Sequence, residues 1–397
     1  AACAALSAGS TIARCAPPLS CAAASAIASA PRTGRSSPAS ESSPANSRPA
    51  SRHAAAHRSA RRLARQIVSS WRTQAIHAAV QIGVLDLLLA GPQRSAQLAE
   101  GLDCSADGLR RLLRALCALG ICRERGDDCF VLAATGKLLC RENSDETTAL
   151  NLRALAIWWG GPMWPMWGHL LYSVRTGASA RTLLSGESGY SHLQNSPETA
   201  ATFHAAMRAM TALIAGEIVG LTLWRDFASV VDVGGGHGEL TVALLAAHPL
   251  LRGTVFDLSH AQAGAEALIA GASLQQRCGF VAGSFFDEIP AHADCYLLKS
   301  ILHNWDDERC AAILDQCRKA MRRESRMLLV ERVRPARLRP TIHDEALART
   351  DLNMLAGLGG RERSLDEFAA LLRPAGLAVQ RVYQTGFEFS VIEAGCA

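Results

Sequence analysis

Hydrophobic runs and helical patterns alternate through the second half of the chain. Short apolar runs, typical of buried strands, fall at residues 230–233, 253–257, 279–282, 293–298, 327–331, 378–383 and 388–394. Helical spacing of apolar positions occupies residues 239–247, 261–270, 307–321 and 365–373. This alternation predicts an α/β domain over residues 229–397, with a mostly parallel sheet and helices on both faces. Ligands of such sheets bind at the carboxyl ends of the strands.

The first folded unit is expected at residues 61–140. Apolar residues recur at helical spacing over 71–88, and shorter helical patterns follow at 95–100 and 109–119. Two strand-like pieces, 121–125 and 129–132, flank a turn of glycine and aspartates. Three helices followed by a hairpin indicate a winged helix. The arginines of the third helix leave DNA binding open, but a solvated arginine face is common, and we favour protein–protein docking.

Residues 141–228 are predicted to be mostly helical. The segment 157–167 holds four of the seven Trp and two of the seven Met, and its glycines and prolines exclude a regular helix. These side chains fit either the core or the wall of a pocket for a flat apolar ligand, because aromatic rings are flat and Met is adaptable. Phe203 and Met207 follow at helical spacing and could line the same wall.

Composition changes the picture mainly at the N-terminus. Residues 1–60 are rich in Ala, Ser, Arg and Pro without periodicity, so we expect them to be disordered. A transit peptide, a mis-assigned start and a dispensable tail all remain open. Residues 1–66 hold nine Arg and one acid, whereas the remainder holds 32 basic and 35 acidic residues. The folded part is thus slightly acidic, which gives no case for nucleic acid as a partner.

The thirteen cysteines form no C-x-x-C pair and several lie in apolar patterns. We interpret them as free thiols in a reducing compartment, and expect a cytoplasmic protein. No apolar stretch approaches the roughly 18 residues of a membrane helix, so no membrane association is expected.

A glycine-rich turn at residues 234–238 follows the apolar run 230–233 and precedes a helical pattern. Glu239 stands where the dinucleotide fingerprint requires a third glycine, so a pyrophosphate site is not indicated. Asp257 lies nineteen residues beyond Gly238, at the end of the second strand, where an acid can accept hydrogen bonds from ribose hydroxyls. Together these features favour a nucleoside ligand without a pyrophosphate.

A specific resemblance emerges at residues 297–310, which include Lys299, His303, Trp305 and Glu308. With the segments 231–238, 256–258, 283–290, 330–331, 351–355 and 359–363, they resemble the small-molecule O-methyltransferases that include the caffeic acid, hydroxyneurosporene and acetylserotonin enzymes. The resemblance extends from about residue 65 to the C-terminus. It implies a Rossmann-like seven-stranded methyltransferase sheet, S-adenosylmethionine as cofactor, and a homodimer formed through the winged-helix domain.

The resemblance also implies roles for individual residues. His303 is expected to be the general base, flanked by Glu331 and Glu362. Asp257 would hold the ribose, Gly234 the methionine end and Phe285 the adenine, and Lys299 would contact the adenosine side. Ser284 replaces an acid of many relatives, and is either an adenine contact or a plain turn residue. The full expected cofactor set is Asp232, Gly234, Gly236, Asp257, Leu258, Ser284, Phe285 and Lys299, and the expected acceptor pocket is Trp158, Met163, Trp164, Phe203, Met207, Asn353 and Met354.

The implied chemistry is consistent with these residue types. A sulfonium methyl group is already activated, so the protein must position an oxygen and remove its proton, which suits a neutral imidazole. No acidic cluster resembles a magnesium site, and we expect metal independence. Two alternatives remain open: a family member with the same cofactor that acts as a hydroxylase or decarboxylase, and a DNA-binding regulator that uses the winged helix.

Overall fold

The computed structural model describes residues 48–126, 128–141, 150–186, 190, 193 and 196–397, and it divides into residues 1–63 and 64–397. Residues 48–67 form one helix, α1 (Arg48–Ile67). The expected disorder of residues 1–60 is therefore wrong for residues 48–60, because Ala and Arg are strong helix formers even without an apolar face. Residues 1–47 lie outside the described residues. None of the helices among the described residues is long and apolar enough to cross a membrane.

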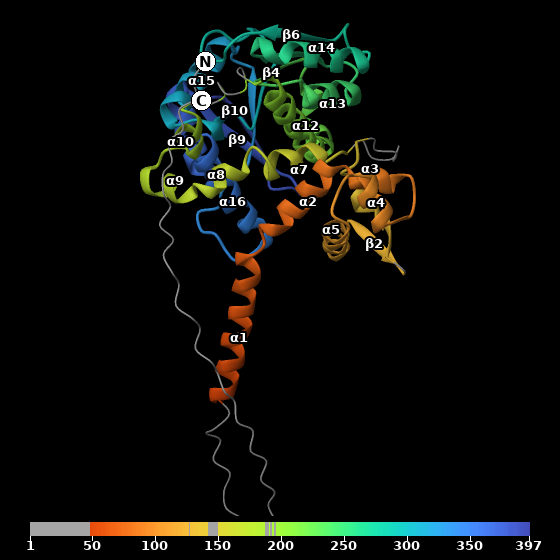
Figure 1. Ribbon diagram of the computed structural model, residues 1–397. Helices are drawn as coiled ribbons and strands as arrows, with labels where there is room; N and C mark the ends of the chain where they lie inside the picture. The colour runs from red at the N-terminus through yellow and green to blue at the C-terminus, as the bar shows by residue number, and fades with distance from the viewer. Residues whose placement is uncertain (1–47, 127, 142–149, 187–189, 191–192, 194–195) are drawn as a thin grey trace, which may run out of the picture. The chain divides into compact units, whose positions relative to one another are not determined.

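The winged-helix domain has the predicted order of elements (Figure 1). The predicted helix 71–88 is two helices, because Gly83 adopts a left-handed backbone with φ of 82° and breaks it. The wing is a three-stranded antiparallel sheet in the order β1-β3-β2. Its elements are α2 (Trp71–Ile82), α3 (Val84–Leu89), β1 (Gln93–Arg94), α4 (Ser95–Gly101), α5 (Ala106–Ala118), β2 (Cys122–Arg125), β3 (Cys129–Leu132) and α6 (Ala134–Lys137).

A helical region connects this domain to the sheet. It comprises α7 (Arg153–Gly160), α8 (Trp164–Gly168), α9 (Leu170–Thr176), α10 (Ala180–Ser185) and α12 (Pro197–Val219). The glycines and prolines of segment 157–167 separate α7 from α8, as the sequence indicates. The α2 helix packs closely on α7, where Gln74 Nε2 donates to the Gly160 carbonyl at 2.8 Å and a Cβ on Gly160 would collide with His77.

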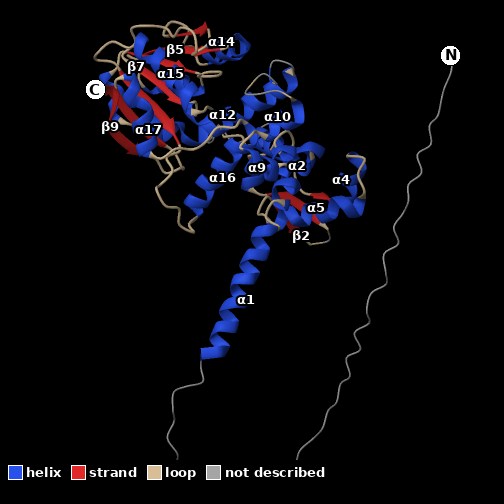
Figure 2. Ribbon diagram, turned by 90° about the vertical axis from the view of Figure 1, so that its left-hand side faces the viewer, coloured by secondary structure: helices blue, strands red, loops and turns tan. Residues whose placement is uncertain are grey.

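The seven-stranded sheet confirms the predicted fold class. Its strand order is β6-β5-β4-β7-β8-β10-β9, parallel from β6 to β8 and antiparallel at β10 and β9. Figure 2 shows strands of this sheet in red among the blue helices that pack around it. The strands are β4 (Ser229–Val233), β5 (Arg252–Asp257), β6 (Cys278–Ala282), β7 (Cys295–Lys299), β8 (Arg326–Glu331), β9 (Leu377–Gln384) and β10 (Ser390–Cys396). The helices around them are α13 (Glu239–Ala247), α14 (Gln262–Gly271), α15 (Asp307–Ala320), α16 (Ile342–Gly357) and α17 (Leu365–Leu372).

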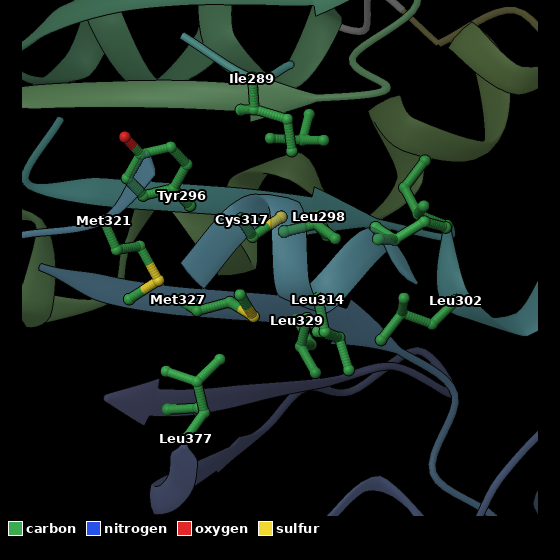
Figure 3. Close-up of a cluster of buried hydrophobic side chains, with 14 of the residues drawn as sticks. Ile289, Tyr296, Leu298, Leu302, Leu314, Cys317, Met321, Met327, Leu329 and Leu377 are labelled. Atoms are coloured by element: carbon green, nitrogen blue, oxygen red, sulfur yellow. The ribbon is translucent and has the colours of Figure 1, made fainter. Parts of the chain in front are cut away.

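Two apolar cores lie on opposite faces of this sheet. On one face, Leu298 of β7 and Leu329 of β8 pack with Leu314 of α15 (Figure 3). Ile313 of α15 and Phe368 of α17 belong to the same cluster. The other residues of these two strands, such as Leu297 and Leu328, pack on the opposite face with α12, α13 and α14. Because helices cover both faces, the carboxyl ends of the strands are the edge where a ligand can approach.

The helix α16 was not predicted. Its apolar residues follow no single face, so the periodicity of the sequence gives no helical signal there. The chain nevertheless begins a helix after Thr341, whose side chain accepts a hydrogen bond from the Asp344 backbone N–H at 3.1 Å. This helix leads into the segment 358–363, which contributes Glu362 to the site described below.

Candidate active site

The glycine turn after β4 requires residues without side chains. Gly234, Gly236 and Gly238 all have positive φ, at 73°, 59° and 84°. A Cβ on Gly238 would lie 2.6 Å from Val255 Cγ2, and one on Gly234 would collide with Ile301. A Cβ on Gly236 would meet nothing within 4 Å. The turn is thus packed on its inner side and open at Gly236, which fits a backbone cradle for a ligand.

Asp257, at the end of β5, closes this cradle. Its Oδ2 accepts a hydrogen bond from the Gly236 N–H at 2.7 Å, and its Oδ1 accepts one from the Leu258 N–H at 2.7 Å. Burial raises the pKa of this carboxyl, while the two N–H donors oppose the rise. The Leu258 side chain is partly exposed at this edge. An oriented carboxylate beside the glycine turn fits the ribose hydroxyls of a nucleoside.

Asp232 and Lys299 lie on neighbouring strands, on the face covered by α13. Asp232 is buried and accepts a hydrogen bond from Thr241 Oγ1 at 2.7 Å, and burial raises its pKa to about 6. Burial and Arg332 lower the pKa of Lys299 to about 8, whereas Glu331, Asp232 and Glu239 oppose the shift.

Lys299 ends β7, and its contact with the adenosine side of the cofactor stays a prediction. β7 pairs with β4 and β8, so β4 and β5 separate Lys299 from β6, which leads to Ser284 and Phe285. The order of strands along the chain does not reveal this separation, because β6 directly precedes β7 in the sequence while β5 and β4 lie between them in the sheet.

Ser284 and Phe285 follow β6 at the same edge. Ser284 Oγ accepts a hydrogen bond from the Phe286 N–H at 3.2 Å, as a turn residue does. The Phe285 ring lies 5.0 Å from that of Phe286 and 6.1 Å from that of Trp305, both edge to face. Phe285 also lies 3.4 Å from the position of a Cβ on Gly234. These rings form an apolar wall beside the cradle.

His303 lies in a short 3₁₀ turn after β7 (Leu302–Asn304) and is buried. Its Nδ1 lies 3.5 Å from Glu331 Oε2 and 3.4 Å from Glu362 Oε2, and both glutamates are fully or almost fully buried. The other oxygen of Glu331 accepts hydrogen bonds from the backbone N–H groups of Ile301 and Leu302, at 3.0 and 2.8 Å. The structure therefore brings together the three residues expected to form the base and its partners.

The two carboxylates change the basicity of His303. Burial lowers the pKa of His303, but Glu331 and Glu362 raise it and prevail, so the net shift is upward. Burial raises the pKa of Glu331. For Glu362 the effect of burial is outweighed, chiefly by His303, and its pKa is lowered. Of the two carboxyls beside the imidazole, Glu362 is accordingly the one that ionises more readily.

These three side chains also form the sole group of potential metal-ligand residues within the described part of the chain, with ligand atoms within 4.8 Å of one another. Every one of them is buried. Their arrangement around an imidazole Nδ1 is equally that of a base oriented by carboxylates.

Four of the expected pocket residues share one cluster. Trp158, Met163, Phe203 and Met207 pack together, and the Trp158 and Phe203 rings are 5.2 Å apart and edge to face. Trp164 is different: it is 38% exposed and lies outside this cluster, because α8 begins there and directs it to the surface.

Two more pocket residues come from α16. Asn353 is buried, and its Oδ1 accepts a hydrogen bond from Trp167 Nε1 at 3.2 Å. Trp167 thus contacts one of the expected pocket residues, and the role of Trp164 in the pocket stays a prediction. Met354 is half-buried on the same helix.

Tyr190 is a site residue that the sequence did not reveal. Its ring lies 5.7 Å from that of Phe203 and 6.3 Å from that of Trp305. Burial raises the pKa of this phenol. Tyr190 therefore joins the aromatic residues of the pocket to those beside the cradle. An isolated tyrosine among Gly and Ser carries no periodic signal that could have identified it.

The fold and the site together define a class of protein. A glycine turn and an oriented carboxylate at the carboxyl edge of a Rossmann-like sheet fit a nucleoside cofactor. Ile301, two residues before the buried His303, lies against Gly234 of that cradle. An enzyme that uses an adenosyl cofactor beside a buried histidine and two buried glutamates is the class that fits.

Comparison with known proteins gives the family. A family model described as the O-methyltransferase domain matches residues 167–378, and one described as the O-methyltransferase dimerisation domain matches residues 64–142. The chain belongs to this O-methyltransferase family and is an S-adenosylmethionine-dependent O-methyltransferase of secondary metabolism.

Its relatives include the phenazine O-methyltransferase of Lysobacter antibioticus, 34% identical over 83% of this chain and 94% of the relative. The mitomycin biosynthesis 6-O-methyltransferase of Streptomyces lavendulae is 36% identical over 80% and 88%. The phenazine-1-carboxylate N-methyltransferase of Pseudomonas aeruginosa is 29% identical over 83% and 96%. A similar solved structure is an O-methyltransferase from neocarzinostatin biosynthesis in complex with S-adenosylmethionine and 2-hydroxy-5-methyl naphthoic acid, with a TM-score of 0.68 and 33% identity over 82% and 96%.

Proposed function

We propose that this enzyme methylates a hydroxyl group of a flat aromatic or polyketide-like small molecule, with His303 as the general base. The observation that carries the proposal is the buried imidazole whose Nδ1 faces Glu331 and Glu362 at 3.5 and 3.4 Å. With Nδ1 protonated and held by carboxylates, Nε2 is left to accept the proton of the acceptor hydroxyl.

The residues divide the chemistry between them. S-adenosylmethionine, when bound, supplies an activated methyl group. The cradle at Gly234 and Gly236 and the carboxylate of Asp257 would hold the cofactor. His303 removes the hydroxyl proton, and Glu362 and Glu331 stabilise the imidazolium that forms. No step in this scheme needs a metal ion, so we expect a chelator such as EDTA to leave turnover unchanged.

The acceptor class follows from the pocket. Trp158, Phe203 and Tyr190 present aromatic rings, and Met163 and Met207 present adaptable thioethers. Flat apolar rings suit such walls. The relatives named for phenazine and naphthoate substrates act on ring systems of this shape. A basic nitrogen needs less help from a base than a hydroxyl does, so the two glutamates beside His303 favour oxygen as the acceptor atom.

The winged-helix domain is proposed to form a homodimer and not to bind nucleic acid. Its arginines face acids of the same domain: Arg114 Nη2 lies 2.9 Å from Glu124, and Arg110 Nη2 lies 3.1 Å from Asp107. These pairs reduce the positive charge that phosphate contacts need. A mobility-shift assay at low salt should show no binding, and salt-dependent binding would overturn this part of the proposal.

The test uses methyl-labelled S-adenosylmethionine with a panel of phenazine-1-carboxylate, dihydroxynaphthoates and 3-amino-4-hydroxybenzoate. We expect labelled O-methyl product from at least one phenol. His303→Ala should then lower turnover by about 10²–10⁴-fold while cofactor binding, measured by calorimetry, persists. Undiminished turnover in His303→Ala would show that His303 is not the base. Labelling only at nitrogen would overturn the proposal that the acceptor atom is a hydroxyl oxygen.

A further inference from the structure

Arg363 holds the turn that carries His303, although the mechanism above does not use it. Its side chain is 1% exposed. Nη1 donates a hydrogen bond to the Leu302 carbonyl at 2.7 Å, and Nη2 donates one to the Trp305 carbonyl at 2.7 Å. These carbonyls lie on either side of His303 in the chain. One rigid guanidinium therefore holds the turn on both sides of the base.

The guanidinium is itself anchored to the first residue of α15. Nε and Nη2 of Arg363 donate to Asp307 Oδ1 at 3.2 and 2.9 Å, and Arg361 donates to the other oxygen of this carboxylate. Hydrogen bonds from the two arginines lower the pKa of Asp307, with Arg361 contributing most. Asp307 thus remains an anion that fixes the orientation of the planar fork.

The main chain of the same segment contacts the other elements of the site. The Arg361 N–H donates to the His303 carbonyl at 2.8 Å, and the Arg334 N–H, just beyond β8, donates to the Arg363 carbonyl at 2.9 Å. Val333 and Arg363 form a parallel bridge. Glu331 ends β8, and Glu362 lies between the two arginines. The segment 361–363 therefore connects all three residues of the base site.

We propose that Arg363 is a positioning residue that fixes the His303 imidazole against Glu331 and Glu362. This inference rests on the proposed function, because it assumes that His303 is the base. Arg363 acts through the carbonyls of Leu302 and Trp305 and does not itself contact acceptor or cofactor. We call the hydrogen bonds from Arg363 to the Leu302 and Trp305 carbonyls the clamp. Misplacement of a catalytic group by about 1 Å can cost about 10²-fold in rate, so loss of the clamp should reduce turnover strongly.

Lysine cannot replace this arginine fully. A lysine ammonium is a compact charge on a flexible stem, whereas the guanidinium reaches two carbonyls and one carboxylate from a single plane. Arg363→Lys should therefore keep the pairing with Asp307 and lose part of the hold on the turn. Arg363→Met removes both while preserving an apolar stem.

The deciding measurement is the pKa of the His303 imidazole, followed by NMR in protein labelled at histidine and bound to S-adenosylhomocysteine. Comparison with His303→Gln assigns the signal. The charged groups that face His303 are Glu331, Glu362 and Arg332. If the clamp aligns the two carboxylates with Nδ1, the pKa should fall from its raised value in Arg363→Met and fall less in Arg363→Lys.

A matched control is Arg277→Met. Arg277 also donates to backbone carbonyls, those of Leu245, His248 and Leu251 at 2.8 to 3.2 Å, but these lie at the opposite edge of the sheet. We expect it to lower the melting temperature and leave the His303 pKa unchanged. If Arg363→Met does not fold, Arg363→Lys alone decides: a lowered pKa supports the inference and an unchanged one overturns it.

Methyl transfer to the best acceptor of the panel provides the second readout. We expect kcat to fall about 10–10²-fold in Arg363→Met, with the affinity for S-adenosylmethionine within twofold of the parent. If His303→Ala loses turnover while Arg363→Met retains both turnover and the His303 pKa, only the positioning role fails. If His303→Ala retains full turnover, the general-base assignment fails instead.

Discussion

Replacing Glu362 by glutamine should separate the charge of this residue from its shape. The side chain is 2% exposed, and its Oε2 lies 3.4 Å from His303 Nδ1. Glutamine retains the volume and one oxygen acceptor but removes the negative charge. Because the pKa of Glu362 is lowered whereas that of Glu331 is raised, Glu362 is the carboxylate expected to be ionised near neutral pH.

The size of the effect follows from the distance. A unit charge pair at 3.4 Å in a medium of effective dielectric constant about 20 is worth about 5 kcal/mol. Relaxation of the site and the second glutamate will absorb part of this energy. We therefore expect the pKa of His303 to fall in Glu362→Gln, because burial then prevails over a single carboxylate.

The sign of the pH dependence is fixed by the role of the base. Only neutral His303 accepts a proton, so kcat should rise with pH through the His303 pKa, which lies above 6.5 in the parent protein. In Glu362→Gln this acidic limb should move to lower pH. The plateau above it should fall by about 10–10³-fold, since the imidazolium formed in the reaction loses its partner.

The assay is kcat from pH 5 to 9 with methyl-labelled S-adenosylmethionine and the best acceptor of the panel. A matched control is Glu388→Gln. Arg332 lies 4.0 Å from Glu362 and 3.3 Å from Glu388, so both glutamates share this arginine. Of the carboxylates, however, Glu362 and Glu331 are the ones that lie against His303. In Glu388→Gln, the acidic limb and the plateau of the kcat–pH profile should both stay as in the parent protein. An acidic limb that stays in place in Glu362→Gln would refute the assignment of that limb to a His303–Glu362 pair.

Two further substitutions test the backbone and the cofactor site. Gly360→Ala places a Cβ in collision with the His303 carbonyl and 2.7 Å from the Asn304 carbonyl carbon, so we expect a lower melting temperature and lower turnover. The control is Gly271→Ala, whose Cβ would meet nothing within 4 Å and which should be neutral or slightly stabilising. Asp257→Asn keeps the volume of the side chain but loses its charge and one of the two oxygens that accept backbone N–H groups. Calorimetry should therefore show about 10–10²-fold weaker binding of S-adenosylmethionine, and unchanged affinity would exclude Asp257 from the cofactor site.

Much of the site could be predicted because strand ends and glycine turns are local features. The run 230–233, the glycines after it and Asp257 identify a nucleoside cradle from spacing alone, and the structure places the Asp257 carboxylate on the Gly236 N–H. His303 and Glu331 were expected from the family resemblance, and they lie just after β7 and at the end of β8, two adjacent parallel strands. Such residues converge because parallel strands share one carboxyl edge.

Features set by strand order or by tertiary contact could not be predicted in this way. Lys299 follows β6 in the chain, but β5 and β4 lie between β6 and its own strand β7 in the sheet. Trp164 and Trp167 belong to one aromatic segment, and only the start of α8 decides that Trp164 faces outward. Helix α16 has no single apolar face because it contacts several elements, so its pattern resembles neither a helix nor a strand.

The segment 359–363 shows why a list of site residues is not yet a site. The sequence identifies Glu362 by resemblance, but the residues on either side of it determine where its carboxylate lies. Gly360 lets the segment approach the His303 carbonyl, the Arg361 N–H binds that carbonyl, and Arg363 holds the turn on both sides. An intact glutamate on a displaced segment would no longer face Nδ1. The basicity of His303 therefore depends on neighbours that never touch the acceptor.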